Sequence, residues 1–252
     1  MRMTRYKAAA THLAISAAIA ATVIFLISVI WYPAPLFNAA GGQLLLILII
    51  GVDVCIGPLL TLVVFNPAKT RRHLAMDLSV IVVLQLAALI YGVCSSFEGR
   101  PVYLTFGKGS FVMVTANNVD DKMLQDARDP QYRSLPLMGP RWVGAQMPKD
   151  PREISDLNFA EAATGMGIHY LPKYFIELPA LRNEIVGNAK PLGDLRKRHP
   201  EFSPQLDMAL TKAKKKAPEV GYIPLRAKRS FLTVLVDRST GEVLDTLDVN
   251  PL

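Results

Sequence analysis

The sequence has few cysteines and, over its first quarter, almost no charge. Only two of its 252 residues are cysteines, Cys55 and Cys94, so the chain beyond residue 94 cannot contain an internal disulfide. From Ala8 to Phe65 there is no lysine or arginine, and the only acid is Asp53. The composition, 51% hydrophobic and 19% charged, excludes a disordered chain, because that class combines low hydrophobicity with high net charge. A soluble core does not explain such a long uncharged stretch.

Three apolar stretches are long enough to cross a bilayer, which takes about 20 helical residues. They run from about 8 to 32, 43 to 65 and 74 to 94. We therefore expect residues 1–98 to form a domain of three transmembrane helices. A cleaved signal peptide is the alternative for the first stretch, because basic residues precede it and Ala18-Ile19-Ala20 resembles a cleavage site. The apolar run continues well beyond that site, which favours an uncleaved anchor.

The basic residues of this first part lie in two short segments that flank the apolar stretches. Because positive residues accumulate in cytoplasmic segments, we expect the N-terminus and the loop from Lys69 to Arg72 to be cytoplasmic, and residues 99–252 to lie on the other side. The net charge of +7 then reflects membrane orientation, with lipids as surroundings, and no nucleic-acid partner is expected. Cys55 and Cys94 fall in or beside the spans, and we interpret them as small residues packed between helices.

Residues 99–252 show short alternating runs that are typical of strands. Pro101–Phe106 and Ser110–Val114, joined by Gly107-Lys108-Gly109, predict a hairpin, and a second hairpin is predicted from Phe231–Val236 and Glu242–Leu247. Between the hairpins, capping signals predict helices over 120–128, 151–164 and 205–216. Strands at both ends with helices between them predict an α+β domain with a mainly antiparallel sheet.

Asp53 is the ionisable residue that most needs an explanation. It lies near the middle of the second apolar stretch, where a charged group costs about 2.5 to 3.5 kcal/mol and is usually paired or functional. Pro58, five residues later, removes a backbone donor and predicts a kink in the helix. A proton-relay or ligand site would use such a group. A hydrogen bond to another helix would also explain it, and the candidate partners are Thr11, Ser16, Thr22 and Gln85.

Asp77 is the second acid of the apolar stretches, which raises the possibility of an intramembrane aspartyl protease. Paired catalytic carboxylates must lie within a few ångströms of each other. The two aspartates are predicted to differ in depth by about 13 Å, at 1.5 Å per helical residue, which argues against that class. We expect Asp77 to be a first-turn acid paired with Arg71 or Arg72.

No catalytic or metal-binding motif occurs in the second part of the chain. His169 and His199 each stand alone, no cysteine accompanies them, and motifs such as GxSxG and HExxH are absent. We expect both histidines to be structural or surface residues. The sequence therefore predicts no enzyme, no metal and no cofactor.

Several motifs together resemble a known family. They include Trp31-Tyr32-Pro33-x-Pro35, the run Gly51-Val52-Asp53-Val54-Cys55-Ile56-Gly57-Pro58 and its continuation to Phe65, and Leu84-Gln85-Leu86 with Asp77 before it. The closing segment Thr233–Asp237 with Thr240-Gly241-Glu242-Val243 adds to them. In these features the chain resembles the type IV pilin accessory proteins of the TfpX/TfpZ type, densely over about the first 100 residues and sparsely in the middle.

The resemblance implies a non-enzymatic, multi-pass protein of the bacterial inner membrane with a periplasmic C-terminal domain. It implies a specific chaperone or assembly factor for a major type IV pilin, with the pilus assembly machinery as a possible further partner. A periplasmic ligand sensor and a small transporter subunit remain as alternatives. The residues expected to bind a partner or to support the membrane motif are Trp31, Tyr32, Pro33, Gly51, Asp53, Gly57, Pro58, Asp77 and Gln85.

Overall fold

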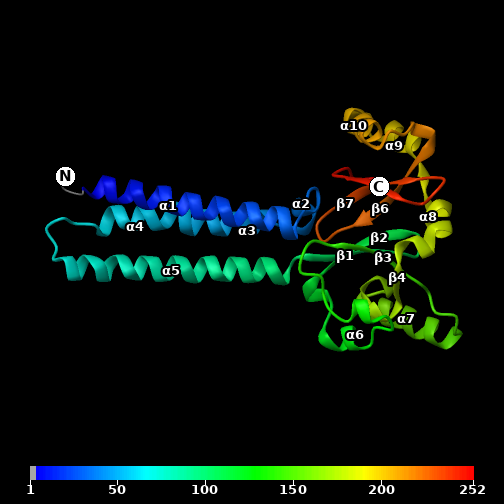
Figure 1. Ribbon diagram of the computed structural model, residues 1–252, viewed down its shortest axis with the longest axis horizontal. Helices are drawn as coiled ribbons and strands as arrows, with labels where there is room; N and C mark the ends of the chain where they lie inside the picture. Colours follow the sequence, from blue (N-terminus) through cyan, green and yellow to red (C-terminus); the bar gives the residue numbers. More distant parts are fainter. Residues whose placement is uncertain (1–3) are drawn as a thin grey trace. The chain divides into compact units, whose positions relative to one another are not determined.

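The computed structural model describes residues 4–252, and its internal contacts divide the chain into two units. The first, which we call the helical unit, comprises the chain up to Phe37 together with Gly41–Glu98. The second, the sheet unit, comprises Gly99–Leu252 together with the short segment Asn38–Ala40. Each unit is described by itself (Figure 1).

The helical unit consists of long apolar helices joined by short turns. Helix α1 (Arg5–Leu26) begins after Thr4, whose hydroxyl accepts a hydrogen bond from the Lys7 amide at 3.3 Å, and it continues into a π-helical segment (Ile27–Trp31). The remaining elements in chain order are α3 (Gln43–Ile49), a second π-helical segment (Ile50–Ile56), α4 (Gly57–Val64) and α5 (Arg71–Glu98). The short helix α2 (Leu36–Ala40), which precedes α3, is divided between the two units after Phe37.

The prediction of three transmembrane helices is wrong. Within residues 4–252, two helices are long and apolar enough to cross a membrane, Arg5–Trp31 with 27 residues and Arg71–Glu98 with 28. The stretch predicted as the second span is divided into α3, the π-helical segment and α4, and its uninterrupted apolar part, Ile50–Val64, is shorter. The irregularity falls just before Pro58, which cannot donate the hydrogen bond that a regular α-helix requires there.

Helices α1 and α5 run in the same direction, and the segment from α3 to α4 returns between them (Figure 1). The rings of Trp31 and Phe97 lie 5.2 Å apart, edge to face, and the Tyr32 hydroxyl donates to the Ser96 carbonyl at 2.9 Å. These contacts join the C-terminal ends of the two long helices. Both cysteines are exposed on the surface of the helical unit, so the prediction that they pack between helices is wrong.

The sheet unit is built on a mixed sheet of eight strands in the described chain, and the prediction of a mainly antiparallel sheet is wrong. The order is β4-β3-β1-β2-β6-β7-β8, with β5 beside β6. At its centre, β1 pairs in parallel with β3, and β2 pairs in parallel with β6. The strands of each parallel pair are far apart in the sequence, with helices and other strands between them, and parallel pairing requires such a long crossover. The strands are β1 (Pro101–Gly107), β2 (Ser110–Thr115), β3 (Arg141–Ala145), β4 (Phe175–Glu177), β5 (Lys190–Pro191), β6 (Val220–Arg226), β7 (Phe231–Asp237) and β8 (Val243–Leu247).

Both predicted hairpins are confirmed, as β1–β2 and β7–β8. The first turns at Lys108 and Gly109, which have φ angles of 46° and 77°. Glycine adopts this left-handed region without a steric penalty. The predicted helix over 151–164 is confirmed as α7 (Pro151–Thr164), which ends at Gly165 with a φ of 74°. The other two predicted helices are shorter, as α6 (Asp121–Gln125) and α10 (Ser203–Ala213). The sequence did not predict α8 (Arg182–Asn188) or α9 (Leu192–Arg198).

Two apolar clusters hold the helices of the sheet unit to the sheet. One joins β1, β3 and β4 to α6 and α7, and it includes Tyr103, Val143 and Leu157. The other joins β6 and β7 to α9 and α10, through Leu195, Leu206 and Tyr222. The unit therefore has an apolar core of its own.

Candidate functional site

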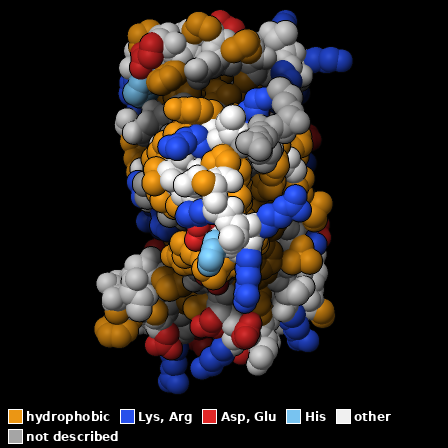
Figure 2. All heavy atoms as spheres, turned by 90° about the vertical axis from the view of Figure 1, so that its left-hand side faces the viewer, with side chains coloured by type: hydrophobic (Ala, Val, Ile, Leu, Met, Phe, Trp, Pro, Cys, Tyr) orange, Lys and Arg blue, Asp and Glu red, His pale blue; other side chains and the backbone are white. Residues whose placement is uncertain are grey.

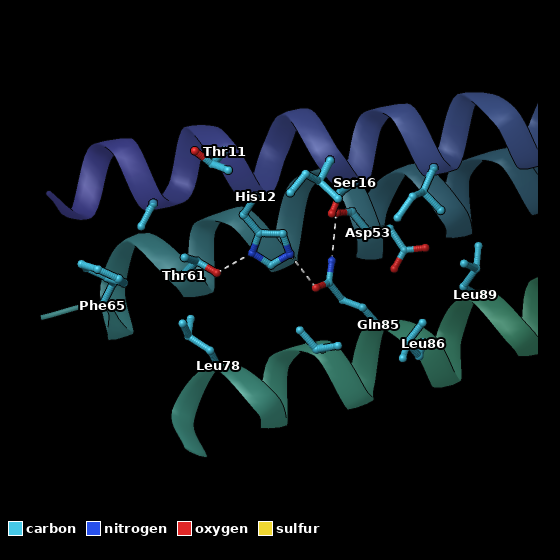
Figure 3. A pocket seen from close by; sticks show the side chains of 14 residues that line it. Thr11, His12, Ser16, Asp53, Thr61, Phe65, Leu78, Gln85, Leu86 and Leu89 are labelled. Atoms are coloured by element: carbon cyan, nitrogen blue, oxygen red, sulfur yellow. Dashed lines mark hydrogen bonds between the residues drawn. The ribbon is translucent and has the colours of Figure 1, made fainter. Parts of the chain in front are cut away.

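A pocket in the helical unit brings polar side chains together among apolar ones (Figure 3). Its volume is about 370 Å³, and its lining comes from α1, α4, α5 and the π-helical segment before α4. Of the residues predicted as site residues, it contains Asp53 and Gln85. The other polar residues of its lining are Thr11, His12, Ser16 and Thr61.

A chain of hydrogen bonds runs through this pocket and connects α1, α5 and the segment that returns between them. The Gln85 amide nitrogen donates to the Asp53 main-chain carbonyl at 3.0 Å, so the Gln85 amide oxygen is left to accept from His12 Nε2 at 2.8 Å. The other ring nitrogen, His12 Nδ1, shares a hydrogen bond with the Thr61 hydroxyl at 2.6 Å. The network thus links α1 to α4 and α5 through the His12 ring.

The carboxyl group of Asp53 takes no part in this network. The residue is 6% exposed, and neither carboxyl oxygen has a hydrogen-bond partner in the part of the chain that the structure describes. Of the interhelical partners predicted for Asp53, Gln85 does bond to it, but at the main-chain carbonyl. The carboxyl group lies instead at the lining of the pocket (Figure 3). A buried polar group without a partner costs free energy, which identifies this carboxyl group as the unusual feature of the site.

Gly57 and Pro58 shape the backbone beside this network. A Cβ atom placed on Gly57 would lie 2.1 Å from the Gln85 amide nitrogen, so glycine is what allows Gln85 to approach. Pro58 is buried in the first turn of α4, where a missing backbone donor is tolerated. Within the described part of the chain, no atom lies within 4 Å of the corresponding position at Gly51, so no close contact described there requires a glycine.

Trp31, Tyr32 and Pro33 lie away from the pocket, at the end of α1. Tyr32 is buried and bonds to α5 through its hydroxyl, and Trp31 packs against Phe97. The Pro33 carbonyl accepts from the Leu36 amide at 2.9 Å, which closes the turn into α2. These residues hold the ends of α1 and α5 together, and the structure does not bring them to the Asp53 pocket.

Asp77 lies near the start of α5 and pairs with Lys69 at 2.6 Å, so the prediction of an Arg71 or Arg72 partner is wrong. The loop before α5 carries Lys69 back to the helix, whereas the two arginines form its first turn. Figure 2 faces the end of the molecule at which α1 and α5 begin, and Lys and Arg side chains stand out there over apolar surface.

His12 and Thr61 were missed by the sequence reasoning, although both are central to the network. His12 carried a usable signal, because it is the one imidazole in a stretch of 58 residues without lysine or arginine. Thr61 carried none, since threonine occurs routinely in apolar helices, where it bonds to its own backbone.

The geometry supports binding rather than proton transfer. The hydrogen-bond chain from Thr61 ends on the main-chain carbonyl of Asp53 and does not reach its carboxyl group. It also passes through the amide of Gln85, a group that does not titrate. No cluster of three or more metal-ligating side chains occurs within residues 4–252. What the site offers is an unpartnered buried carboxyl group in an apolar pocket.

Two carboxylates of the sheet unit, those of Asp237 and Glu153, have in contrast several partners each. Asp237 is 3% exposed, and it accepts hydrogen bonds from the Ser239 amide and hydroxyl and from the Thr240 amide, and it pairs with Lys215 at 2.8 Å. The Lys215 ammonium group, with these bonds, holds the pKa of Asp237 well below its ordinary value. This carboxylate stabilises the turn of the closing hairpin.

A second charged cluster lies beside the edge strand β4 and shows the same saturation. Glu153 accepts from Lys173 at 2.6 Å and from the Tyr174 hydroxyl at 2.7 Å. Mainly through Lys173, the pKa of Glu153 is lowered. His169 is buried, and its ring nitrogen Nε2 donates to the Gly107 carbonyl at 2.9 Å. Burial lowers the pKa of His169, which keeps the ring neutral, and its Nδ1 has no hydrogen-bond partner in the described chain.

Comparison with known proteins identifies relatives over most of the chain. The family model described as fimbrial assembly protein FimB matches residues 2–41. The fimbrial assembly proteins of serogroup E1 and serogroup I of Dichelobacter nodosus are each 29% identical to this chain over 235 residues, which is 92% of this chain and 91% of the relative. None of the solved structures gives a significant match.

A further relative from the same organism establishes the family. The fimbrial assembly protein of serogroups C1 and C2 is 36% identical over 113 residues, which cover 45% of this chain and 86% of that relative. The predicted resemblance to an accessory family of type IV pilus assembly is therefore confirmed. This chain belongs to the family of fimbrial assembly proteins.

Proposed function

We propose that this chain is a non-enzymatic accessory protein of type IV pilus assembly that is anchored in the inner membrane and binds the major pilin. The observation that carries the proposal is the division of the chain into an apolar helical unit and a sheet unit with a separate core. A pilin subunit waiting in the membrane has the same two parts, one helix and one globular head outside. A helper with both kinds of unit can contact both parts.

The direction of the two long helices supports a membrane orientation for this proposal. Both α1 and α5 begin at ends rich in cations, with Arg5 and Lys7 at one and Lys69, Arg71 and Arg72 at the other. Their other ends are joined through Trp31, and tryptophan favours the membrane interface. The positive-inside rule then makes the basic ends cytoplasmic. Residue 99 follows directly after α5, so the sheet unit is periplasmic in this proposal.

The orientation can be tested with single cysteines in a chain that lacks Cys55 and Cys94. Met138→Cys places a thiol at an exposed position of the sheet unit, and Ala68→Cys places one in the basic loop. A membrane-impermeant maleimide should label the first in intact spheroplasts and the second only after lysis. Labelling of Ala68→Cys in intact spheroplasts would contradict the proposed orientation.

The pilin partner can be tested by co-purification in mild detergent. The tagged full chain should recover the pilin of its own strain and not a heterologous pilin, and a strain that lacks this chain should lose pili. Equal recovery of both pilins would contradict a specific chaperone, and normal piliation of the deletion strain would contradict a role in assembly.

A further inference from the structure

The pocket around Asp53 is an open groove, with apolar walls and a polar floor. Its walls come from exposed side chains, Ile15 and Ile19 on α1 and Val82 and Leu86 on α5. Its floor comes from the returning segment and holds the buried residues Asp53 and Thr61. Figure 3 shows α1 and α5 on opposite sides, with the returning segment between and behind them.

The length of the groove corresponds to three turns of a helix. Its lining extends from Ala8 to Ile19 on α1 and from Leu78 to Leu89 on α5. Each distance corresponds to about 16 Å, or three helical turns, at 1.5 Å per residue. Apolar walls exposed in this way gain from close packing against another apolar helix, which is what drives helix association in membranes.

The floor adds a chemical requirement to this shape. Both oxygens of the Asp53 carboxyl group lack a partner in the described chain, whereas His12, Thr61 and Gln85 already bond to one another. Because both oxygens are already shielded from solvent, no water compensates for the missing hydrogen bonds, and a donor that an occupant of the groove supplies at that level would satisfy them.

We propose that this groove is the docking site for one apolar helix of the pilin, and that this helix presents an N–H or O–H donor to the Asp53 carboxyl group. The inference rests on the proposed function, because that function supplies the pilin as partner. It adds the place of contact in the helical unit, the shape of the contact, and the chemistry that selects the bound helix.

A photo-crosslinking amino acid at two leucines of α5 tests the place of contact. Leu86 lines the groove and is 51% exposed, whereas Leu84 does not line it and is 60% exposed. With the full chain and its pilin together in native membranes, Leu86 should give at least about tenfold more pilin adduct than Leu84. Equal amounts of pilin adduct from both positions would show that the groove is not the pilin docking site. Adducts from Leu86 that contain only lipid or a second copy of this chain would show the same.

Two pairs of variants test the shape and the chemistry. Leu86→Trp should obstruct the groove and lower pilin recovery about tenfold, whereas Leu84→Trp should leave it unchanged. Asp53→Leu should lower recovery about tenfold through loss of the acceptor, and Asp53→Asn, which keeps an acceptor oxygen, should retain most of it. Unchanged recovery with both Leu86→Trp and Asp53→Leu would overturn the inference.

These outcomes separate the inference from the proposed function. If the wild-type chain recovers the pilin while Leu86 and Leu84 give equal amounts of pilin adduct, the groove is not the docking site and the proposed function stands. If the wild-type chain recovers no pilin, both are wrong. The tryptophan pair keeps the test decisive even if Asp53→Leu lowers the amount of folded protein.

Discussion

Two buried aspartates, one in each unit, have opposite surroundings. In the sheet unit, Asp237 accepts bonds from three donors of its own turn and pairs with Lys215. In the helical unit, the carboxyl group of Asp53 has no partner in the described chain, although a hydrogen-bond network passes beside it. The first carboxylate stabilises the fold of its own unit. The second leaves a requirement that a molecule from outside can satisfy.

The difference shows where a structural explanation suffices and where it does not. A saturated carboxylate stabilises the native state, because unfolding exposes it and breaks its bonds. An unpartnered one destabilises the isolated protein, so stability gives no reason for its presence. The comparison therefore predicts that changes at Asp237 lower stability, whereas changes at Asp53 affect partner binding.

The largest expected effect on stability is that of Asp237→Asn. Loss of the charge weakens the Lys215 pair and the turn, and should lower the free energy of unfolding by about 2 to 3 kcal/mol at neutral pH. Unfolding of the full chain in detergent can be followed by Trp142 fluorescence in a Trp31→Phe background, since the two tryptophans fall one in each unit.

The effect of Asp237→Asn on stability should depend on pH. The pKa of Asp237 is lowered in the folded state from an ordinary value of 3.8. Its contribution is therefore fully present above about pH 3.8, and is lost as the pH falls below that value toward the folded pKa. The difference in free energy of unfolding between wild type and Asp237→Asn should become smaller at low pH. A gap that is constant between pH 7 and pH 3 would contradict the electrostatic explanation.

A smaller effect is expected from Gly57→Ala, which tests the network of the helical unit. The new Cβ would displace Gln85 and break its bonds to His12 and to the Asp53 carbonyl. We expect a loss of about 1 to 2 kcal/mol, since hydrogen bonds between membrane helices contribute about 0.6 kcal/mol each on average and up to about 1.7. Trp31 fluorescence in a Trp142→Phe background reports on this unit.

Gly51→Ala is the matched control for this change, because no described atom lies within 4 Å of the position of its Cβ. It should be neutral or slightly stabilising, since alanine favours a helix more than glycine does. Equal losses from both variants would show that the backbone, and not Gln85, is responsible.

The smallest effect is expected from Tyr32→Phe. This change removes the bond from the Tyr32 hydroxyl to the Ser96 carbonyl and keeps the ring, so it should cost about 1 kcal/mol in the helical unit. Ser96→Ala leaves that carbonyl in place and should cost less. A larger loss from Ser96→Ala would mean that the Ser96 hydroxyl, which donates to the Gly92 carbonyl, is the more important group.

The sequence predicted local features of the fold better than long-range ones. The two hairpins and α7 carry their own turn and cap residues, and these elements were found. The strands β3 and β6 were missed because Gly144, Gly221 and Pro224 interrupt their patterns, and glycine and proline inside a strand argue against it. Without these two strands, the parallel pairs at the centre of the sheet could not be foreseen.

The same limit applies to the candidate site. Asp53 and Gln85 stand out in an apolar stretch, so their importance could be read from the sequence alone. The bond of Gln85 to a main-chain carbonyl depends on the close approach that Gly57 permits, which no sequence pattern encodes. The pairing of Asp77 with Lys69 likewise depends on how the loop before α5 folds back.

The central claim, that the Asp53 carboxyl group serves a partner and not the fold, is tested most directly by Asp53→Leu in the full chain. Two quantities should be measured on the same preparation, unfolding of the helical unit by Trp31 fluorescence and recovery of the pilin. We predict equal or greater stability than wild type, because an unpartnered polar group is removed, together with pilin recovery reduced about tenfold. Lower stability with unchanged pilin recovery would contradict the account.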